Sequence, residues 1–432
     1  MKNRPRKLEW ATPLPYAVGN AAEELFFCLL RSQSVNGRRL VLFPASLPRL
    51  NGYETRSDTL MHLTAKEIIQ LSQRSQNILR WLLAASYLPT RITSRLLFFF
   101  FRRRLSERLN FPRLGISKLW EIPYVDHKYS QSVSSESFWK RQRELFIPPM
   151  LNNAQNDACK EQLRELGVEK DDWFVCLHVR ETGYRGDSDR KTYRNASIHD
   201  CVKGIHKVTQ RGGWVVRLGD PTMTPLPPME RVIDYPFSAQ KSGVMDLFLI
   251  QNCRFYIGML SGPWDIAELF KKDKLGINIY DCSVGFAYGK NDRAILKHVF
   301  SVEKGRYLSL KELFSAKEDL MNINGVVSDA YRYVDNTEGE IADAVENYLQ
   351  LMDGESSEVS LQQEQASRYW KEHALERLRV GTITGTGVSA ERRSEHHRFK
   401  AKIEMSETYI DRTYLVQNWD QDSFEQPPNQ FY

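Results

Sequence analysis

The run Trp173-Phe-Val-Cys-Leu-His-Val179 decides the fold of this 432-residue chain. It is almost continuously apolar, which is typical of a strand buried on both faces of a parallel sheet. Comparable short runs follow at 214–218, 255–259 and 275–280. Helices are expected between them, over 197–210, from Ser242, and from Pro263, where proline suits a first helical turn. This alternation predicts a doubly wound α/β domain at about 166–300, closed by a helix at 336–352.

The N-terminal half carries part of the same pattern. A helix is expected from about residue 20 to 31 and a strand at 39–43, which together form half of a βαβ unit. A long helical region is expected over 57–88 and a further strand at 119–125. We therefore divide the chain into a first domain at 1–165, a second at 166–352, and an extension at 353–432. The extension begins with polar residues and is expected to pack back over a domain or to be partly disordered.

Composition narrows the function classes. The chain is 41% hydrophobic and 26% charged, as globular proteins are, and its net charge of +6 permits an anionic substrate without indicating nucleic acid. Six widely spaced cysteines form no C-x-x-C pair, which argues against zinc and thioredoxin sites and fits a reducing cytoplasm. No run of 18 apolar residues and no signal peptide is apparent.

One insertion, at about 78–109, is unusual because aromatic and apolar residues adjoin clustered arginines. Between Trp81 and Arg104 it carries four consecutive phenylalanines followed by three arginines. Such a composition suits a segment that lies on a membrane surface. A pair of core helices with a solvated basic end explains it equally well.

Polar residues follow three of the expected strands, at His178 and Arg180, at Arg217 and Asp220, and at Ser261 and Gly262. Ligands of open α/β sheets bind outside the carboxyl ends of the strands, so these positions are expected to converge. A guanidinium holds two phosphate oxygens at once, and the first N–H groups of a helix bind the same anions.

Each position also has an ordinary structural explanation, and their occurrence in order along one α/β unit favours a shared site. His178 would be a satisfied strand-end histidine, Arg180 a partner of Glu181, Asp220 a turn cap, Asp246 a first-turn acid, and Ser261-Gly262 a simple N-cap.

This ordered set resembles the fucosyltransferase-like glycosyltransferases with an H-x-R motif. It is closer still to a bacterial glycosyltransferase family tied to surface polysaccharides. The residues that carry the resemblance are Leu177-His-Val-Arg-Glu-Thr182, Tyr193-Arg-Asn195, Gly213-Trp-Val-Val-Arg-Leu-Gly-Asp220, Asp246-Leu-Phe-Leu249, Cys253-Arg-Phe-Tyr-Ile-Gly258 and Ser261-Gly262. It covers about 170–285 and extends to Tyr16-Ala-Val-Gly-Asn20. It implies a GT-B-like fold, in which two Rossmann-like domains face a cleft.

The resemblance also implies roles. Arg180 would hold the β-phosphate of the donor, and His178 would orient that site. Arg217, Asp220, Asp246 and Ser261 would line the donor-nucleotide pocket, with Gly262 admitting the backbone, and Gly19 and Asn20 would face the cleft from the first domain. The sequence departs from the family pattern between Thr182 and Tyr193, so the donor stays open, with a GDP-sugar as one candidate.

The resembled families work without a bound metal ion, and we predict none here, nor any other cofactor. Asp187-Ser-Asp189 matches the D-x-D of metal-dependent transferases, but a chain of this length has about one or two such triplets by chance, and Asp420-Gln-Asp422 is another. The acceptor base stays open among Glu23, Glu24, Glu181 and Asp187.

The sequence thus predicts an inverting transfer from a nucleotide sugar to a glycan or lipid-linked acceptor in surface polysaccharide biosynthesis. The enzyme would be cytoplasmic and peripheral at the inner membrane, with residues 81–104 contacting the membrane. Two alternatives remain, a non-catalytic scaffold that binds a nucleotide sugar or glycan, and a pyruvyltransferase-like enzyme.

Overall fold

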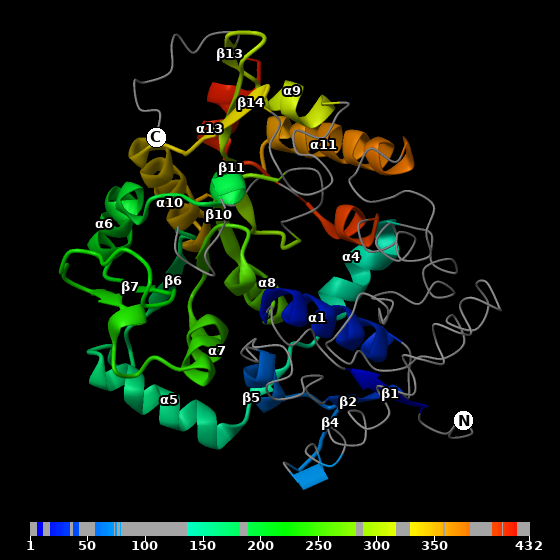
Figure 1. Ribbon diagram of the computed structural model, residues 1–432, viewed down its shortest axis with the longest axis vertical. Coiled ribbons are helices and arrows are strands. Elements are labelled where there is room, and N and C mark those ends of the chain that lie inside the picture. The colour runs from blue at the N-terminus through cyan, green and yellow to red at the C-terminus, as the bar shows by residue number, and fades with distance from the viewer. Residues whose placement is uncertain are drawn as a thin grey trace.

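The computed structural model describes thirteen stretches of the chain, shown as coloured ribbons in Figure 1. They are residues 7–11, 18–34, 38–42, 57–72, 74–75, 78, 136–181, 189–281, 288–316, 329–356, 359–380, 400–407 and 409–420.

A parallel sheet of six strands organises the second half of the chain. Its spatial order is β11-β10-β9-β6-β7-β8, with every neighbouring pair parallel. The strands are β6 (Phe174–His178), β7 (Trp214–Arg217), β8 (Val232–Asp234), β9 (Tyr256–Gly258), β10 (Lys274–Ile279) and β11 (Arg293–Leu296). Numbered from β6, this is the order 6-5-4-1-2-3 of a Rossmann sheet. The predicted doubly wound α/β domain is confirmed.

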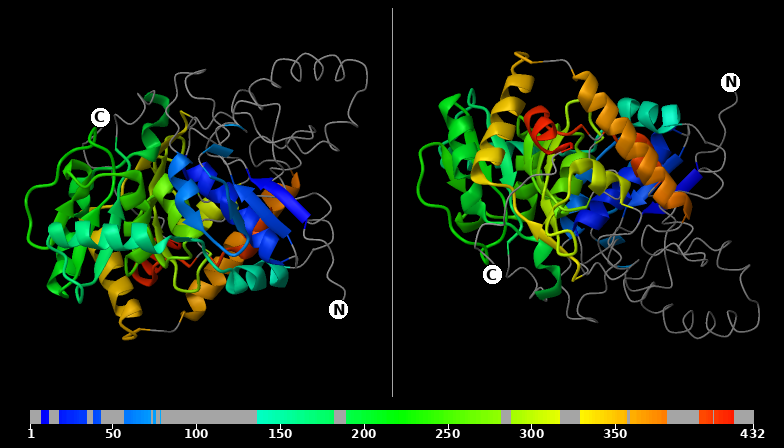
Figure 2. Two further views of the ribbon diagram at one scale, coloured as in Figure 1. Left: turned by 90° about the horizontal axis from the view of Figure 1, so that it is seen from below. Right: turned by 90° about the horizontal axis from the view of Figure 1, so that it is seen from above.

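Helices cover both faces of this sheet (Figures 1 and 2). One face packs on α6 (Val202–Gln210) and α10 (Glu338–Met352), and the other on α5 (Asn153–Glu165), α7 (Gly243–Asn252) and α8 (Gly262–Leu269). The side chains of β6 alternate between the two layers. Phe174 and Cys176 pack with α7 and α8, whereas Val175 and Leu177 pack with α6 and α10. Burial on both faces explains the apolar sequence of this strand.

A smaller parallel sheet forms the first unit, in the order β1-β2-β4. Its strands are β1 (Lys7–Ala11), β2 (Arg38–Leu42) and β4 (Ile68–Gln70), and α1 (Val18–Ser34) connects β1 to β2. Apolar residues of α1 share one hydrophobic core with α8, which lies beside it in Figures 1 and 2. The predicted GT-B-like arrangement of two α/β units is confirmed at this level.

The helix predicted over 57–88 is wrong for residues 57–72, whereas the described residues 74, 75 and 78 are helical. Residues 57–62 form a single 3₁₀ segment, η1 (Ser57–His62), and strands follow directly at β3 (Leu63–Thr64) and β4. β3 pairs with β5 (Met150–Leu151), and β4 adds to the edge of β2. Pairing with distant strands overrides local helical spacing here. The basic aromatic insertion at 78–109 lies outside the described residues except for Ile78, as does the strand predicted at 119–125.

The described part of the C-terminal extension packs back on the protein, as one of the two expectations had it: Lys402 pairs with Glu23 of α1, and the remainder packs on the second unit. Helix α11 (Leu361–Val380) buries Trp370 and Ala374 in the core that holds α6 and α10. The Gln363 Nε2 atom donates to the Ile410 carbonyl, and Ile410 in turn bridges to Ala294 of β11. Helix α13 (Arg412–Asn418) completes this layer.

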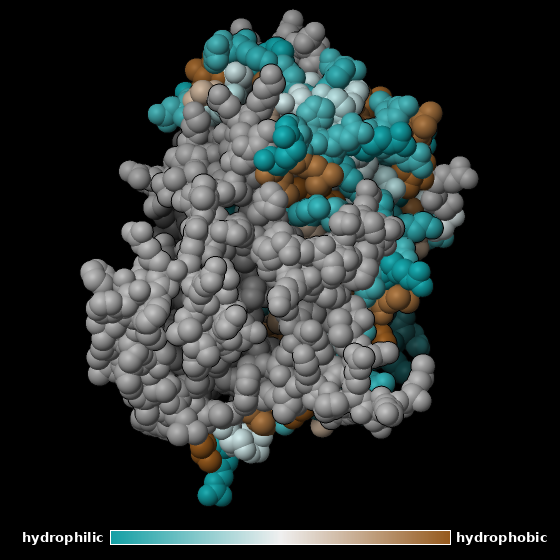
Figure 3. Space-filling model, turned by 90° about the vertical axis from the view of Figure 1, so that its right-hand side faces the viewer, coloured by the Kyte–Doolittle hydropathy of each residue, from teal (hydrophilic) through white to brown (hydrophobic). Residues whose placement is uncertain are grey.

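The remaining elements surround these layers. They are α4 (Glu136–Leu145), η3 (Asp189–Arg194), η4 (Ile198–Cys201), η5 (Tyr235–Phe237), β12 (His298–Ser301), β13 (Arg306–Tyr307), α9 (Leu310–Ser315) and β14 (Tyr331–Val334). None of the described helices is both long and apolar enough to cross a bilayer. In Figure 3 the described surface is mostly hydrophilic, with small apolar spots.

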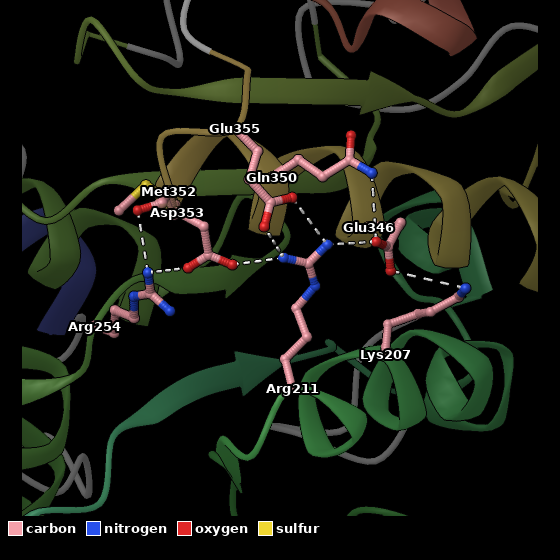
Figure 4. A network of polar contacts seen from close by, with 8 residues as sticks. All are labelled: Lys207, Arg211, Arg254, Glu346, Gln350, Met352, Asp353 and Glu355. Atoms are coloured by element: carbon pink, nitrogen blue, oxygen red, sulfur yellow. Dashed lines mark hydrogen bonds and ion pairs between the residues drawn. The ribbon is translucent and has the colours of Figure 1, made fainter.

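Ion pairs fix α10 at the amino-terminal edge of the large sheet (Figure 4). Arg211, which ends α6, pairs with Glu346, Asp353 and Glu355, at 2.7, 2.6 and 3.2 Å. Arg254, just before β9, pairs with Asp353 at 2.5 Å. This charged cluster closes the edge opposite to the predicted site. The site is therefore expected at the carboxyl edge, where the strand-end residues lie.

Candidate functional site

Strands β6 and β9 are neighbours at the point where the sheet reverses direction. His178 lies opposite Gly258 in the register of this pair. The connection after β6 runs over one face through α6, and the connection after β9 runs over the other through α8. Sheets of this kind bind ligands in the crevice that such a reversal opens at the carboxyl edge. The structure therefore places His178 and Ser261 at the expected binding position.

His178 and Ser261 are in direct contact there. The Ser261 Oγ and His178 Nδ1 atoms lie 3.2 Å apart, and Oγ also donates to the Met259 carbonyl at 3.1 Å. Ser261 occupies the N-cap position of α8, yet its side chain makes no capping hydrogen bond. The simple N-cap explanation for Ser261 therefore fails, and its hydroxyl joins the ends of β6 and β9 instead.

Positive charge surrounds His178. Burial, together with the charges of Arg217, Lys241 and Arg180, lowers the pKa of its imidazole to about 3, with Asp220 opposing the shift. The imidazole is therefore neutral at physiological pH. Of these cations, Arg180 and Lys241 could bind an anionic ligand at this edge, whereas Arg217 is enclosed by its own carboxylates.

Lys241 is a member of this group that sequence reasoning missed. Its ammonium pairs with both carboxylate oxygens of Asp246, at 2.5 and 2.6 Å, and lies 4.9 Å from the centre of the Tyr235 ring. It directly precedes Ser242, the N-cap of α7. A cation at a helix N-terminus interacts unfavourably with the helix dipole. The unusual position of Lys241 in the sequence could therefore have marked it as a candidate site residue.

Arg180 is half-buried just beyond the end of β6. Its carbonyl accepts a hydrogen bond from the Ala196 amide at 2.9 Å. Its charge favours the ionised forms of Tyr193 and Tyr280 as well as lowering the pKa of His178, so the guanidinium lies near these three side chains. Contact of Arg180 with a donor phosphate remains a prediction.

Arg217 does not have the position that a donor-binding role requires. Its side chain is 0% exposed and forms ion pairs with Glu181 and Asp234, both at 2.8 Å. The same two carboxylates accept the Thr224 and Leu226 amides, at 3.0 and 2.8 Å. We correct the prediction accordingly. Arg217 joins the ends of β6, β7 and β8 and anchors the loop after β7, because a guanidinium enclosed by two carboxylates has no face left for phosphate.

Asp220 and Asp246 lie at the expected edge with local partners. Asp220 follows β7 and accepts hydrogen bonds from the Thr222 amide at 2.9 Å and the Thr222 hydroxyl at 2.5 Å, which forms a turn. Burial raises the pKa of Asp246, and the Lys241 ammonium opposes that shift. Contact of either carboxylate with a nucleotide remains a prediction.

The two α/β units meet at Gly19 and Gly262. A Cβ atom placed on Gly19 would lie 2.5 Å from the Gly262 Cα atom and 2.8 Å from Asp265 Oδ2, so the helix backbones are in contact. Asn20 is exposed beside this crossing. Gly19 was expected to face the cleft, but it packs directly on Gly262 of the second unit, so the first turns of α1 and α8 adjoin at the carboxyl edges of both sheets.

Acidic residues lie beneath this crossing. Burial raises the pKa of Asp265 to about 7, and the negative charge of Glu23 contributes, while Lys402 and Lys274 oppose the shift. Lys402 pairs with Glu23 at 2.7 Å. Glu24 is buried. Among the open base candidates, Glu23 and Glu181 thus already serve in ion pairs, and the described residues contain no group of three or more His, Cys, Asp or Glu that could hold a metal ion. Asp187 lies outside them, and the side chain of Asp189 is not described.

Asp265→Asn should change how stability depends on pH. The folded-state pKa of about 7 lies above the ordinary value of 3.8, so the stability that Asp265 contributes is present below about pH 4 and is lost as the pH rises towards 7. At pH 8 the free energy of unfolding of the asparagine variant should exceed that of the wild type by up to about 4 kcal/mol, so the variant should melt at a higher temperature. The difference should vanish near pH 4. Melting curves between pH 4 and 8 test this, with the exposed Asp157→Asn as control. Parallel pH profiles for wild type and Asp265→Asn would refute it.

Comparison with known proteins gives two structural likenesses. No protein-family model and no curated protein matches this chain. A glycosyl transferase family 9 structure from Veillonella parvula DSM 2008 is 12% identical, with a TM-score of 0.41, over 80% of this chain and 97% of that one. The E. coli heptosyltransferase WaaC, solved with ADP-2-deoxy-2-fluoro heptose, is 13% identical, with a TM-score of 0.29, over 67% of this chain and 92% of that one. Both TM-scores are below 0.5, so these likenesses say nothing of the substrate, and the relation to fucosyltransferase-like enzymes stays a prediction.

Proposed function

We propose that this chain is a glycosyltransferase that takes a sugar from a nucleotide-sugar donor, with the donor diphosphate bound between the ends of β6 and β9. The observation that carries the proposal is the presence of two cations, Arg180 and Lys241, near the neutral His178 at the reversal point of a Rossmann-ordered sheet. A diphosphate is the anion that such crevices suit, because helix N–H groups and arginine side chains bind its oxygens together.

Each part of the crevice has a task in this proposal. Arg180 and Lys241 bind the diphosphate, and the Gly262 N–H at the start of α8 adds to them, because Ser261 does not cap that helix and the next residue, Pro263, has no N–H. Asp220 faces the nucleoside, and Asp246 holds the Lys241 ammonium. Gly262, where no side chain intervenes, and Gly19 on the first unit bring the two backbones together at this edge.

The reaction is an inverting displacement. The acceptor oxygen forms its bond to the anomeric carbon while the bond from that carbon to the diphosphate oxygen breaks on the opposite face. The diphosphate leaves with the electron pair, and the acceptor proton passes to a base. Arg180 lowers the barrier because the charge that it faces grows as the bond breaks.

The biological setting belongs to the same proposal. The first unit would receive a glycan or lipid-linked acceptor in the synthesis of a surface polysaccharide. The enzyme would act in the cytoplasm at the inner membrane, reached through residues 81–104, and without an essential metal ion. A GDP-sugar is one candidate donor.

A thermal-shift panel tests the proposal. GDP, UDP, ADP, CMP and dTDP, with their sugars, would each be added to the full chain, with inorganic phosphate as control. We expect one nucleotide and its sugars to stabilise the fold by about 2.7 kcal/mol at one hundred times the dissociation constant. If no nucleotide shifts the melting point, the donor site is refuted. Slow donor hydrolysis would distinguish an enzyme from a scaffold, and a pyruvyltransferase would show no preference for nucleotide sugars.

A further inference from the structure

A short segment, 192–196, crosses the carboxyl edge of the sheet next to Arg180. The Ala196 amide binds the carbonyl of Arg180 after β6, and the Asn195 carbonyl accepts from the Lys297 ammonium after β11. Between them, the Arg194 guanidinium lies 5.5 Å from the centre of the Tyr280 ring, which follows β10. The segment therefore spans the side of the crevice away from Asp220.

The Asn195 side chain within this segment is an anomaly. It is 9% exposed, and neither Oδ1 nor Nδ2 has a hydrogen-bond partner among the residues that the structure describes. The Nε atom of Arg194 is likewise buried without one. A buried amide that lacks partners costs about 1–3 kcal/mol, so native proteins rarely keep one without a use for it.

Aromatic residues flank the same segment. The rings of Tyr193 and Tyr280 pack edge to face, with centres 5.3 Å apart, and Tyr333 lies 5.7 Å from Tyr193. Burial raises the pKa of Tyr280 to about 12, so its hydroxyl remains a neutral donor and acceptor. The charge of Asp281 raises the pKa of both Tyr193 and Tyr280, and the charges of Arg194 and Arg180 oppose it.

We propose that Asn195, with Arg194, Tyr193 and Tyr280, forms the subsite for the glycosyl group of the donor. The inference rests on the proposed function, since it places the sugar next to the phosphate that Arg180 binds. Vicinal hydroxyls of a sugar ring both donate and accept hydrogen bonds, as an amide does, and aromatic faces suit its C–H groups. A nucleobase would use similar groups, and the experiment below separates the two.

Asn195→Ala is the decisive variant because it separates binding from stability. Removing an amide that has no protein partner should leave the melting point of the free protein unchanged or raise it. The affinity for the nucleotide sugar should fall at least tenfold, whereas the affinity for the matching nucleoside diphosphate should change less than twofold. Titration calorimetry with the pair found in the nucleotide panel measures both.

Asn336→Ala provides the matched control. Asn336 is also a buried amide, but it accepts from the Asn278 amide at 2.7 Å and donates to the Leu296 carbonyl at 2.6 Å. Its replacement should lower the melting point and leave the ratio of the two affinities unchanged.

The possible results separate the two proposals. If the wild type binds no nucleotide, the proposed function fails and the subsite with it. If the wild type binds nucleoside diphosphate and nucleotide sugar, but Asn195→Ala weakens both equally or neither, the subsite alone is refuted and the donor site stands. Loss of stability in Asn195→Ala comparable to that in Asn336→Ala would likewise refute the subsite, because the amide would then be structural.

Discussion

Replacing Arg180 with alanine should reduce the affinity for the nucleoside diphosphate at least one-hundredfold and leave the fold intact. Hydrogen bonds to charged groups contribute about 1.5–3 kcal/mol each, and a guanidinium offers two of them to one diphosphate. Arg180 is half-buried at the reversal point, where His178 is neutral and cannot replace its charge. Arg180→Lys should lower the affinity about tenfold, since an ammonium keeps the positive charge but cannot form the paired hydrogen bonds of a guanidinium.

Arg254→Ala is the control for this loss. Arg254 carries the same charge but lies at the opposite edge of the sheet, where it pairs with Asp353. Its removal should leave the affinity unchanged. Calorimetric titration of the three variants with the strongest nucleoside diphosphate of the panel, and with pyrophosphate, gives the comparison. Equal affinities for Arg180→Ala and wild type would remove Arg180 from the phosphate site.

Gly19→Val should strongly destabilise the fold. The first added carbon would lie 2.5 Å from a backbone atom of Gly262, and a backbone cannot move aside as a flexible side chain does. The helices α1 and α8 would have to separate, and a loss of at least about 3 kcal/mol is expected. Chemical denaturation measures it.

Gly339→Ala shows what a harmless glycine replacement does. Gly339 lies in the first turn of α10, and an added Cβ would meet only the Thr337 hydroxyl, at 3.9 Å. The variant should be as stable as the wild type or gain up to about 1 kcal/mol, because alanine favours helix. If Gly19→Val unfolded at the same denaturant concentration as Gly339→Ala, the close crossing would be disproved.

The four central strands could be predicted because a strand that is buried on both faces has an almost continuously apolar sequence. The runs at 173–179, 214–218, 255–259 and 275–280 all became strands of one sheet, and the positions after three of them lie together. We could predict that the residues after these strands lie close together, because parallel strands have their carboxyl ends at the same edge of the sheet.

The failures came from partners that are distant in sequence. Arg217 sits in an apolar run, and nothing local indicates that Glu181 and Asp234 enclose it. The segment 57–70 has helical spacing, yet β3 and β4 gain more by pairing with β5 and β2. Helix α5 was assigned to the first domain, but it packs on α7 of the second. No local sequence pattern encodes this contact between α5 and α7.

The glycine crossing has a consequence for anyone who divides this chain into pieces. The apolar side of α1 and that of α8 fill a single interior, and Phe26 of α1 also packs on Phe146, which follows α4. A fragment that starts after α1 would therefore expose the apolar side of α8 to water. A fragment that stops before α8 would expose the apolar side of α1 in the same way. We therefore expect the two units to unfold together, although each has a sheet of its own.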